Sequence, residues 1–81
     1  MKFKRTGPNS ASSDDGFEVK IAKRNELHYV AGGNATIVPI EIMTDRVVVV
    51  SVSYVTSVDR ELIRTHIADA LDYLHIPHRF D

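Results

Sequence analysis

The stretch ATIVPIEIMTDRVVVVSVSYVT, residues 35–56, decides the fold because it contains two strongly β-prone runs separated by a short turn. The first run, residues 35–43, alternates between two faces, which predicts a strand with one buried side. Pro39 lies inside this run and has no N–H to donate, so we expect an edge strand or a bulge there. The second run, residues 46–56, is apolar on both faces in its first half, which is typical of a central strand. Residues 44–45 leave room for a tight hairpin turn between the two strands.

Two further strands are predicted upstream of this pair. Residues 17–21, FEVKI, alternate between apolar and polar side chains, and residues 27–31, LHYVA, follow the same period of two. Gly32 and Gly33 then give the strongest turn signal in the chain, because glycine tolerates positive φ. A phosphate-binding loop is not favoured there, because no helical pattern follows the glycines.

One amphipathic helix is predicted near the C-terminal end of the sequence. Ser57 is the expected N-cap, and Asp59 and Glu61 place negative charge in the first turn, where the helix dipole favours it. Apolar residues recur at helical spacing and form one broad stripe, which comprises Val58, Leu62, Ile63, Ile67, Ala70, Leu71 and Leu74.

These elements predict an α+β fold, namely an antiparallel β-meander of about four strands with one C-terminal α-helix packed on one face. We expect residues 17–81 to form this single small domain. Residues 1–16 are expected to be a disordered N-terminal tail, because residues 4–16 contain one alanine and no larger apolar side chain. The buried core is predicted to unite the sheet and the helix stripe through Val19, Leu27, Val50, Val52, Ile63, Ile67 and Leu71.

Composition excludes several classes of function. The 81 residues carry 10 Lys and Arg against 11 Asp and Glu, so a net charge of −1 provides no general attraction to nucleic acid or to a membrane. The chain contains no cysteine, which excludes disulfides, zinc fingers and thiol catalysis. The basic start at residues 1–5 is not followed by an apolar run, so we expect no secretory signal and a cytoplasmic location.

The last eight residues, LHIPHRFD, place His75 and His78 around Pro77 and raise the question of a metal or catalytic site. Because proline cannot continue a helix, a helix end near His75 already accounts for this pattern. Residues 78–81 then alternate and could add a short edge strand. A metal ion would need three or four converging ligands, yet His66 and His75 lie about 180° apart around the helix axis.

Known catalytic motifs are also missing, since the sequence has no GxSxG, HExxH or Walker pattern. Glu41 lies on a mostly apolar strand and is expected to pair with Arg46 across the hairpin. We therefore expect a non-enzymatic protein with no catalytic, cofactor-binding or metal site. The residues alone assign no further role to Glu41, His66, His75 or His78.

A resemblance supports a binding function. Tyr29-x-x-Gly32-Gly33, then Pro39 and Glu41, a valine-rich strand and a helix ending IADALDYLHIPHRFD resemble a family of small bacterial immunity proteins directed against polymorphic toxins. The resemblance covers about residues 27–81, although Asn34 stands where the family has an arginine and the tryptophan before the helix is absent. It implies a non-enzymatic protein that neutralises a cognate toxin by binding it.

The second face of the sheet is the predicted interface, because one helix covers only one face. An exposed apolar patch of this kind marks a protein contact, and we expect it to serve a homodimer or a partner through Val30, Ile37, Met43, Val47 and Val49. The alternative function is a small nucleic-acid-associated or regulatory domain that uses the basic N-terminus, Lys2, Lys4 and Arg5. Nucleic-acid binding is the less favoured of the two, because the whole domain is nearly neutral.

Overall fold

The strand β5, Asn34–Ile42, joins the two parts of the sheet in the computed structural model, which describes residues 2–55 and 59–81. Most of β5 pairs with β4, Glu26–Ala31, and its last three residues pair with β6, Val48–Val50. Pro39 lies where the pairing partner changes, and its backbone points away from β4. Its missing N–H therefore removes no hydrogen bond from the β4–β5 ladder, which is the placement expected of a strand proline.

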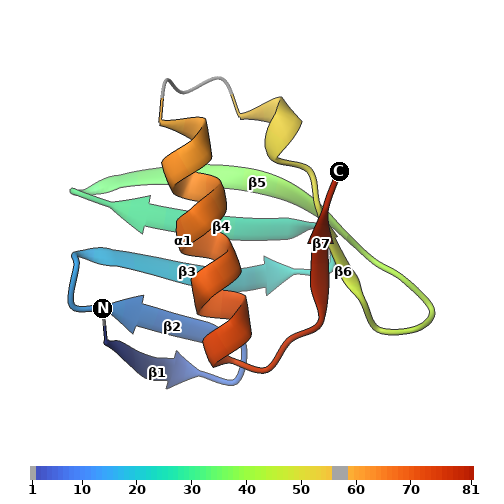
Figure 1. Ribbon diagram of the computed structural model, residues 1–81, viewed down its shortest axis with the longest axis horizontal. Coiled ribbons are helices and arrows are strands. Elements are labelled where there is room, and N and C mark those ends of the chain that lie inside the picture. The colour runs from blue at the N-terminus through green and yellow to red at the C-terminus, as the bar shows by residue number, and fades with distance from the viewer. Residues whose placement is uncertain (1, 56–58) are drawn as a thin grey trace.

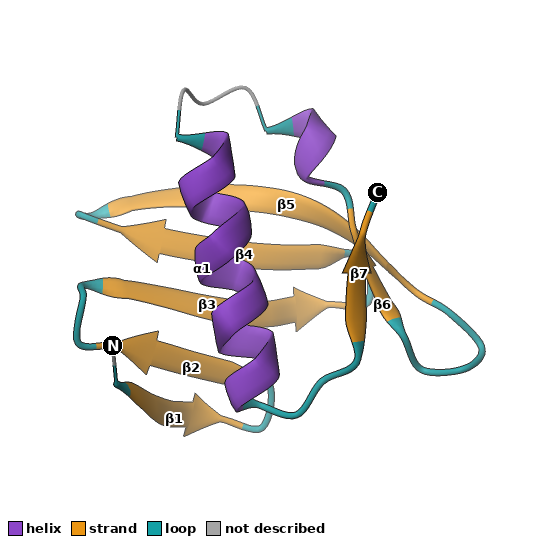
Figure 2. Cartoon of the chain, in the orientation of Figure 1, coloured by secondary structure: helices purple, strands orange, loops and turns teal. Residues whose placement is uncertain are grey.

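Seven strands make up the sheet among the described residues, and they lie side by side in chain order. The remaining four are β1, Phe3–Gly7, β2, Ser10–Ser13, β3, Phe17–Lys23, and β7, His78–Phe80. Figure 1 shows β6 and β7 turned steeply against β1–β4, so that the sheet curls around the α-helix α1, Arg60–Tyr73. Figure 2 shows the same two-layer arrangement by element type, with the helix lying across one face of the strands.

The α+β class is confirmed, but the number of strands and the pairing pattern differ from the expected meander of about four. The four expected strands correspond to β3, β4, β5 and β6, and three more strands extend the sheet at its two ends. The pairing of β6 with β7 is parallel, whereas every other neighbouring pair is antiparallel. The reason is that α1 lies between β6 and β7 in the chain, and a helical crossover returns the chain in the same direction.

The expectation of a disordered tail at residues 1–16 is not what the structure contains, since β1 and β2 extend the sheet there. Phe3 anchors this hairpin, because its ring stacks on Tyr73 at a centroid distance of 5.3 Å and meets the edge of Phe17 at 5.8 Å. Ala11 is fully buried against the helix side of the sheet. One aromatic ring and a shared backbone ladder thus order a segment that composition alone predicts to be unfolded.

The expected long strand over residues 46–56 is shorter than predicted. β6 ends at Val50, and Val52–Tyr54 forms one turn of 3-10 helix, which is closed by the Val55 amide donating to the Val52 carbonyl at 2.9 Å. Val52 and Val55 are still buried. The turn carries the chain from the sheet towards the helix layer while both valines keep their contacts with the core.

The helix α1, Arg60–Tyr73, covers the inner face of the sheet. Its N-cap is Asp59, while the expected N-cap Ser57 and the stripe residue Val58 lie outside the described residues. Leu62 is 52% exposed and does not belong to the buried stripe. All seven predicted core residues are buried, namely Val19, Leu27, Val50, Val52, Ile63, Ile67 and Leu71.

The helix ends as the proline predicted. The Ile76 amide donates to the Leu71 carbonyl at 2.9 Å and the His75 amide donates to the Asp72 carbonyl at 3.1 Å, which together form a Schellman motif. His75 occupies the left-handed position of this motif, with φ of 59°. Residues after Pro77 then enter β7 beside β6, at the place where the sequence allowed a short edge strand.

Candidate functional site

The five predicted interface residues lie in two separate groups on the outer side of the sheet. Val30 lies opposite Ala35, and His28 lies opposite Ile37, so Val30 and Ile37 are diagonal neighbours about 7–8 Å apart. Ile37 is 59% exposed, and Val30 is half-buried. This pair forms one apolar group on β4 and β5.

Met43, Val47 and Val49 form the second group, at the turn between β5 and β6. The Met43 amide donates to the Val47 carbonyl at 2.9 Å, and Val49 lies opposite Glu41. Ile37 and Glu41 are four residues apart on one strand, which corresponds to roughly 13 Å. The structure therefore divides the predicted interface, and Ile37 is its most exposed member.

An open strand edge lies beside Ile37. The Ile40 amide donates to the Asn25 carbonyl, and the Ser51 amide donates to the Pro39 carbonyl. Because backbone groups alternate along a strand, even-numbered residues of β5 face β4 and odd-numbered residues face the other way. The N–H and C=O groups of Ala35 and Ile37 thus point away from β4, and they make no hydrogen bond among the described residues.

The 3-10 turn is the reason that this edge is open. In the β5–β6 register, where Ile40 pairs with Val50, residue 53 would lie opposite Ile37 and residue 55 opposite Ala35. The chain instead leaves the sheet after Ser51 and turns at Val52–Tyr54. We name the backbone of Ala35–Ile37 on this side the β5 edge.

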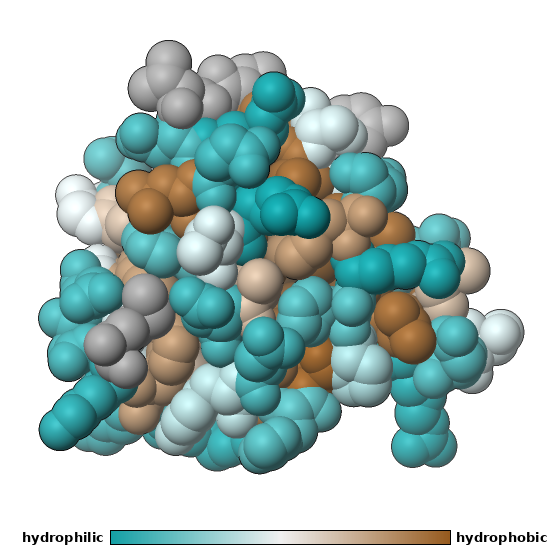
Figure 3. All heavy atoms as spheres, in the orientation of Figure 1, coloured by the Kyte–Doolittle hydropathy of each residue, from teal (hydrophilic) through white to brown (hydrophobic). Residues whose placement is uncertain are grey.

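A pocket of about 260 Å³ adjoins the β5 edge on the helix side of the sheet. Tyr29, Ala31, Asn34 and Thr36 line it from β4 and β5, and Asp59, Leu62 and Ile63 line it from the start of the helix. Its wall is therefore partly apolar, and Asp59 is the only charged residue among the described residues that line it. On this helix side, hydrophobic atoms reach the surface in separate areas among hydrophilic ones (Figure 3).

Three rings pack beneath this pocket. His66 of α1 lies flat against Phe17, with a centroid distance of 3.9 Å and an interplanar angle of 4°, and its Nδ1 atom lies 2.7 Å from the Tyr29 hydroxyl oxygen. When the imidazole is neutral and its proton is on Nε2, the phenol donates and Nδ1 accepts. Burial raises the pKa of the Tyr29 phenol above its ordinary value, and the Asp59 carboxylate raises this pKa further. The Asp59 charge therefore acts across the pocket on a buried group.

Two of the other histidines, His28 and His78, have local partners. The Nδ1 atom of His78 bonds with the Ile76 carbonyl at 2.9 Å, and its ring meets the edge of Phe80. His28 lies 3.2 Å from the Glu26 carboxylate. Among the described residues, no group of three or more His, Cys, Asp or Glu side chains converges as metal ligands would.

The expected ion pair between Glu41 and Arg46 does not form. Glu41 makes no ion pair within the part of the chain that the structure describes, and Arg46 lies in the turn with φ of 69°. Val49, rather than Arg46, is opposite Glu41 in the strand register. The expectation assumed a hairpin register in which these two residues faced each other across the turn.

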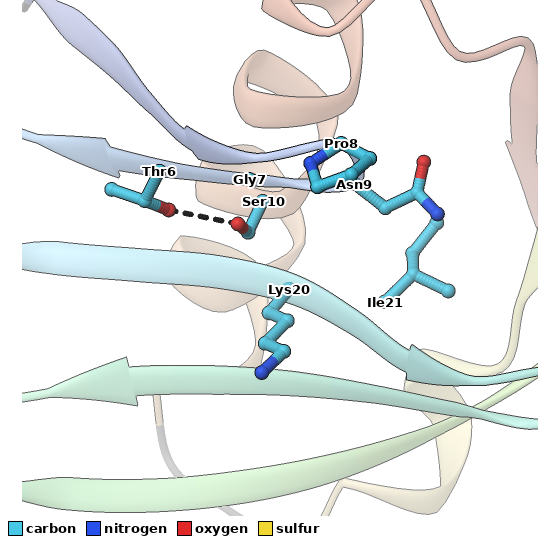
Figure 4. A pocket seen from close by; sticks show the side chains of 7 residues that line it. All are labelled: Thr6, Gly7, Pro8, Asn9, Ser10, Lys20 and Ile21. Atoms are coloured by element: carbon cyan, nitrogen blue, oxygen red, sulfur yellow. Dashed lines mark hydrogen bonds between the residues drawn. The ribbon is translucent and has the colours of Figure 1, made fainter.

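A second pocket, of about 310 Å³, lies at the turn between β1 and β2 (Figure 4). The Thr6 hydroxyl donates to the Ser10 hydroxyl at 2.8 Å and also lies 3.0 Å from the Glu18 carboxylate. Figure 4 shows the Lys20 side chain extending away from these hydroxyls, so the polar groups of this pocket do not converge on one point.

The basic N-terminal residues belong to β1 and the residue before it. The Arg5 guanidinium donates to the Pro8 carbonyl at 2.8 Å, and the Lys2 backbone amide donates to the Asp14 carboxylate at 2.8 Å. Lys4 is exposed. Of these three basic side chains, that of Arg5 is therefore held by the turn between β1 and β2.

Comparison with known proteins finds no match for this chain among family models, curated proteins or solved structures. No helix within the described residues is long and apolar enough to cross a membrane. The sequence reasoning found Ile37, but it missed the β5 edge and the pocket, because both depend on where β6 leaves the sheet.

Proposed function

We propose that this chain is a small non-enzymatic protein-binding module that acts as an immunity protein and neutralises a cognate toxin by binding it. The observation that carries the proposal is Ile37, a large apolar side chain that is 59% exposed beside a strand edge that no described residue pairs. Natural proteins usually cover or charge such edges, because an open edge pairs with other chains. The resemblance of residues 27–81 to immunity proteins supplies the identity of the partner class.

The polar groups of the chain favour binding over catalysis. His66 is engaged by Tyr29 and Phe17, and the Ser51 hydroxyl donates to the Asp81 carboxylate at 3.0 Å. A catalytic nucleophile would need a base within hydrogen-bond reach and a third group that orients the base. These side chains instead hold strands and helix together.

We expect a toxin-like gene beside the gene for this chain, and the test is neutralisation of its product. We expect the two proteins to form a complex and the toxin to lose its toxicity on co-expression. Ile37→Asp should weaken the complex about 30-fold or more, because a charge replaces an apolar contact at the interface. Lys4→Gln on the far edge is the matched control and should leave the affinity unchanged. Absence of a complex, or equal affinities for both variants, would contradict the proposal.

Two other uses of the chain give different results. A nucleic-acid-associated domain would bind RNA or DNA with an affinity that falls steeply with salt, at a slope set by the number of phosphate contacts. A symmetric homodimer would sediment at twice the monomer mass at about 100 μM, since association depends on protomer concentration. Binding of the toxin by a monomer, with flat nucleic-acid titrations, is the outcome that the proposal requires.

A further inference from the structure

The β5 edge has the hydrogen-bonding pattern of an incomplete sheet. Ala35 and Ile37 each direct one N–H donor and one C=O acceptor to the side away from β4, and residue 36 between them faces β4. An extended segment that lies antiparallel to β5 would exchange pairs of hydrogen bonds with Ala35 and with Ile37. The next residue along that could continue the ladder is Pro39, which has no donor, so the edge accepts a short segment only.

The pocket lies where a side chain of the added strand would point. Residues opposite each other in antiparallel strands share one face of the sheet, so the residue opposite Thr36 points to the helix side. Thr36 itself lines the pocket, together with Leu62 and Ile63 of α1. Backbone pairing with Ala35 and Ile37 would hold an added strand of any sequence in register. Only the side chain opposite Thr36 would enter a defined site.

The chemistry of the pocket selects the side chain. Ala31, Leu62 and Ile63 offer apolar contact, and Asp59 is the charged residue among the described residues that line the pocket. A carboxylate has about four lone-pair sites, so it can bond a guest as well as its other partners. The positive end of the helix dipole, about half a unit charge, offsets only part of the negative charge of Asp59. A long aliphatic stem with a cationic end fits both parts of the pocket.

We propose that the β5 edge accepts one extended segment of the partner protein, and that a lysine or arginine of that segment enters the pocket beside Thr36 and reaches Asp59. The proposal rests on the proposed protein-binding function and specifies how the partner is held. Main-chain hydrogen bonds to Ala35 and Ile37 provide sequence-independent attachment, and the cation in the pocket provides selectivity.

Short synthetic peptides test the edge without a known partner. The probe is an acetylated and amidated pentapeptide, Thr-Val-Lys-Val-Thr, titrated to about 5 mM because so few contacts correspond to a Kd near 1 mM. We expect the amide signals of Ala35 and Ile37 to shift in NMR spectra. The same peptide with a central glutamate should bind about tenfold more weakly, because its charge repels Asp59. Unchanged Ala35 and Ile37 signals with every peptide would overturn the proposal.

Two variants locate the contacts. Ile37→Pro removes the outward N–H while leaving the β4 ladder intact, as Pro39 already does at the same parity, and it should abolish the shifts. Ile37→Ala keeps the N–H and is its control, for which binding should persist. Asp59→Asn should make the affinities for the lysine and glutamate peptides equal. This test does not depend on whether Ile37→Pro folds. Equal binding of the two peptides to the unaltered protein would refute the cation-binding pocket.

The two proposals fail separately. If the toxin binds and the peptides do not, the module binds its partner through the outer sheet face and the strand-addition proposal is wrong. If the peptides bind as expected and the toxin does not, the β5 edge serves another protein and the immunity function is wrong.

Discussion

Two edges of the sheet differ in how they are protected, namely the end strand β1 and the β5 edge. β1 carries Lys4 and Arg5, its register shifts between Arg5 and Gly7, and Pro8 follows its last residue. Charge, irregular register and proline are the usual devices that keep an edge from pairing with another chain. The β5 edge, Ala35–Ile37, has no charged residue and no shift in register. The difference indicates that the β5 edge is better suited than β1 to accept a partner strand.

The two edges share one core, which gives the largest expected effect. Ile67 is fully buried near the centre of α1, in the core cluster between the helix and the sheet. Ile67→Ala should lower the free energy of unfolding by about 2–5 kcal/mol, because it removes buried methyl groups and leaves a cavity. Urea denaturation measures this loss, and Ile67→Val is the control, at about 0.5–1.5 kcal/mol. A loss below about 1 kcal/mol for alanine would mean that the helix does not dock as described.

Phe3→Ala should destabilise the β1 edge without affecting the β5 edge. Phe3 is partly buried between Phe17 and Tyr73, so we expect a loss of about 1–3 kcal/mol, less than for a fully buried ring. Amide exchange should accelerate in β1 and β2 while β4 and β5 keep their rates. Phe3→Leu is the control and should lose less. Unchanged exchange at residues 3–13 in Phe3→Ala would show that this segment does not depend on its aromatic anchor.

Tyr29→Phe tests the ring cluster beneath the pocket at the open edge. Removing the hydroxyl that bonds with His66 should cost about 1 kcal/mol at neutral pH, while Tyr73→Phe, whose hydroxyl makes no hydrogen bond among the described residues, should cost about nothing.

The same pair of variants has an expected pH dependence. The pKa of Tyr29 is raised in the folded state, so the folded protein binds more protons than the unfolded chain once pH exceeds about 10, and stability falls as pH rises further. The difference in free energy of unfolding between the unaltered protein and Tyr29→Phe should therefore have its full value below about pH 10 and shrink above it. A constant difference up to pH 11 would contradict the raised pKa.

Ile37→Ala has the smallest expected effect on stability. Its side chain lies on the exposed side of β5, so truncation should change the free energy of unfolding by about 0.5 kcal/mol or less. Ile40→Ala, three residues further on the buried side of the same strand, should cost about 2–5 kcal/mol. Similar losses for the two variants would mean that Ile37 is covered in solution.

The buried residues of β3, β4 and α1 could be predicted from the sequence, because period-two and helical patterns report directly on burial. Val19, Leu27 and Ile67 were placed correctly in the core for that reason. The β1–β2 hairpin was missed because its order comes from Phe3 and from backbone pairing, and neither contributes to the apolar content of residues 4–16.

The candidate site was only half predictable. Alternation along β5 identified Ile37 as an outward residue, but the β5 edge required knowledge that the chain turns after Ser51. The valine-rich run gives the same β-prone pattern whether residues 52–54 continue the strand or form a 3-10 turn. The signal that favours the turn is spatial, because the chain must reach the start of α1 above the sheet.

Amide hydrogen exchange along β5 tests the open edge most directly. Thr36 and Val38 donate towards β4, whereas Ala35 and Ile37 point to the side that no described residue pairs. The amides of Thr36 and Val38 should exchange about 100-fold more slowly than those of Ala35 and Ile37 in the isolated protein at low concentration. Equal protection at all four residues would mean that the edge is already occupied, and would contradict a β5 edge that is free to receive a partner strand.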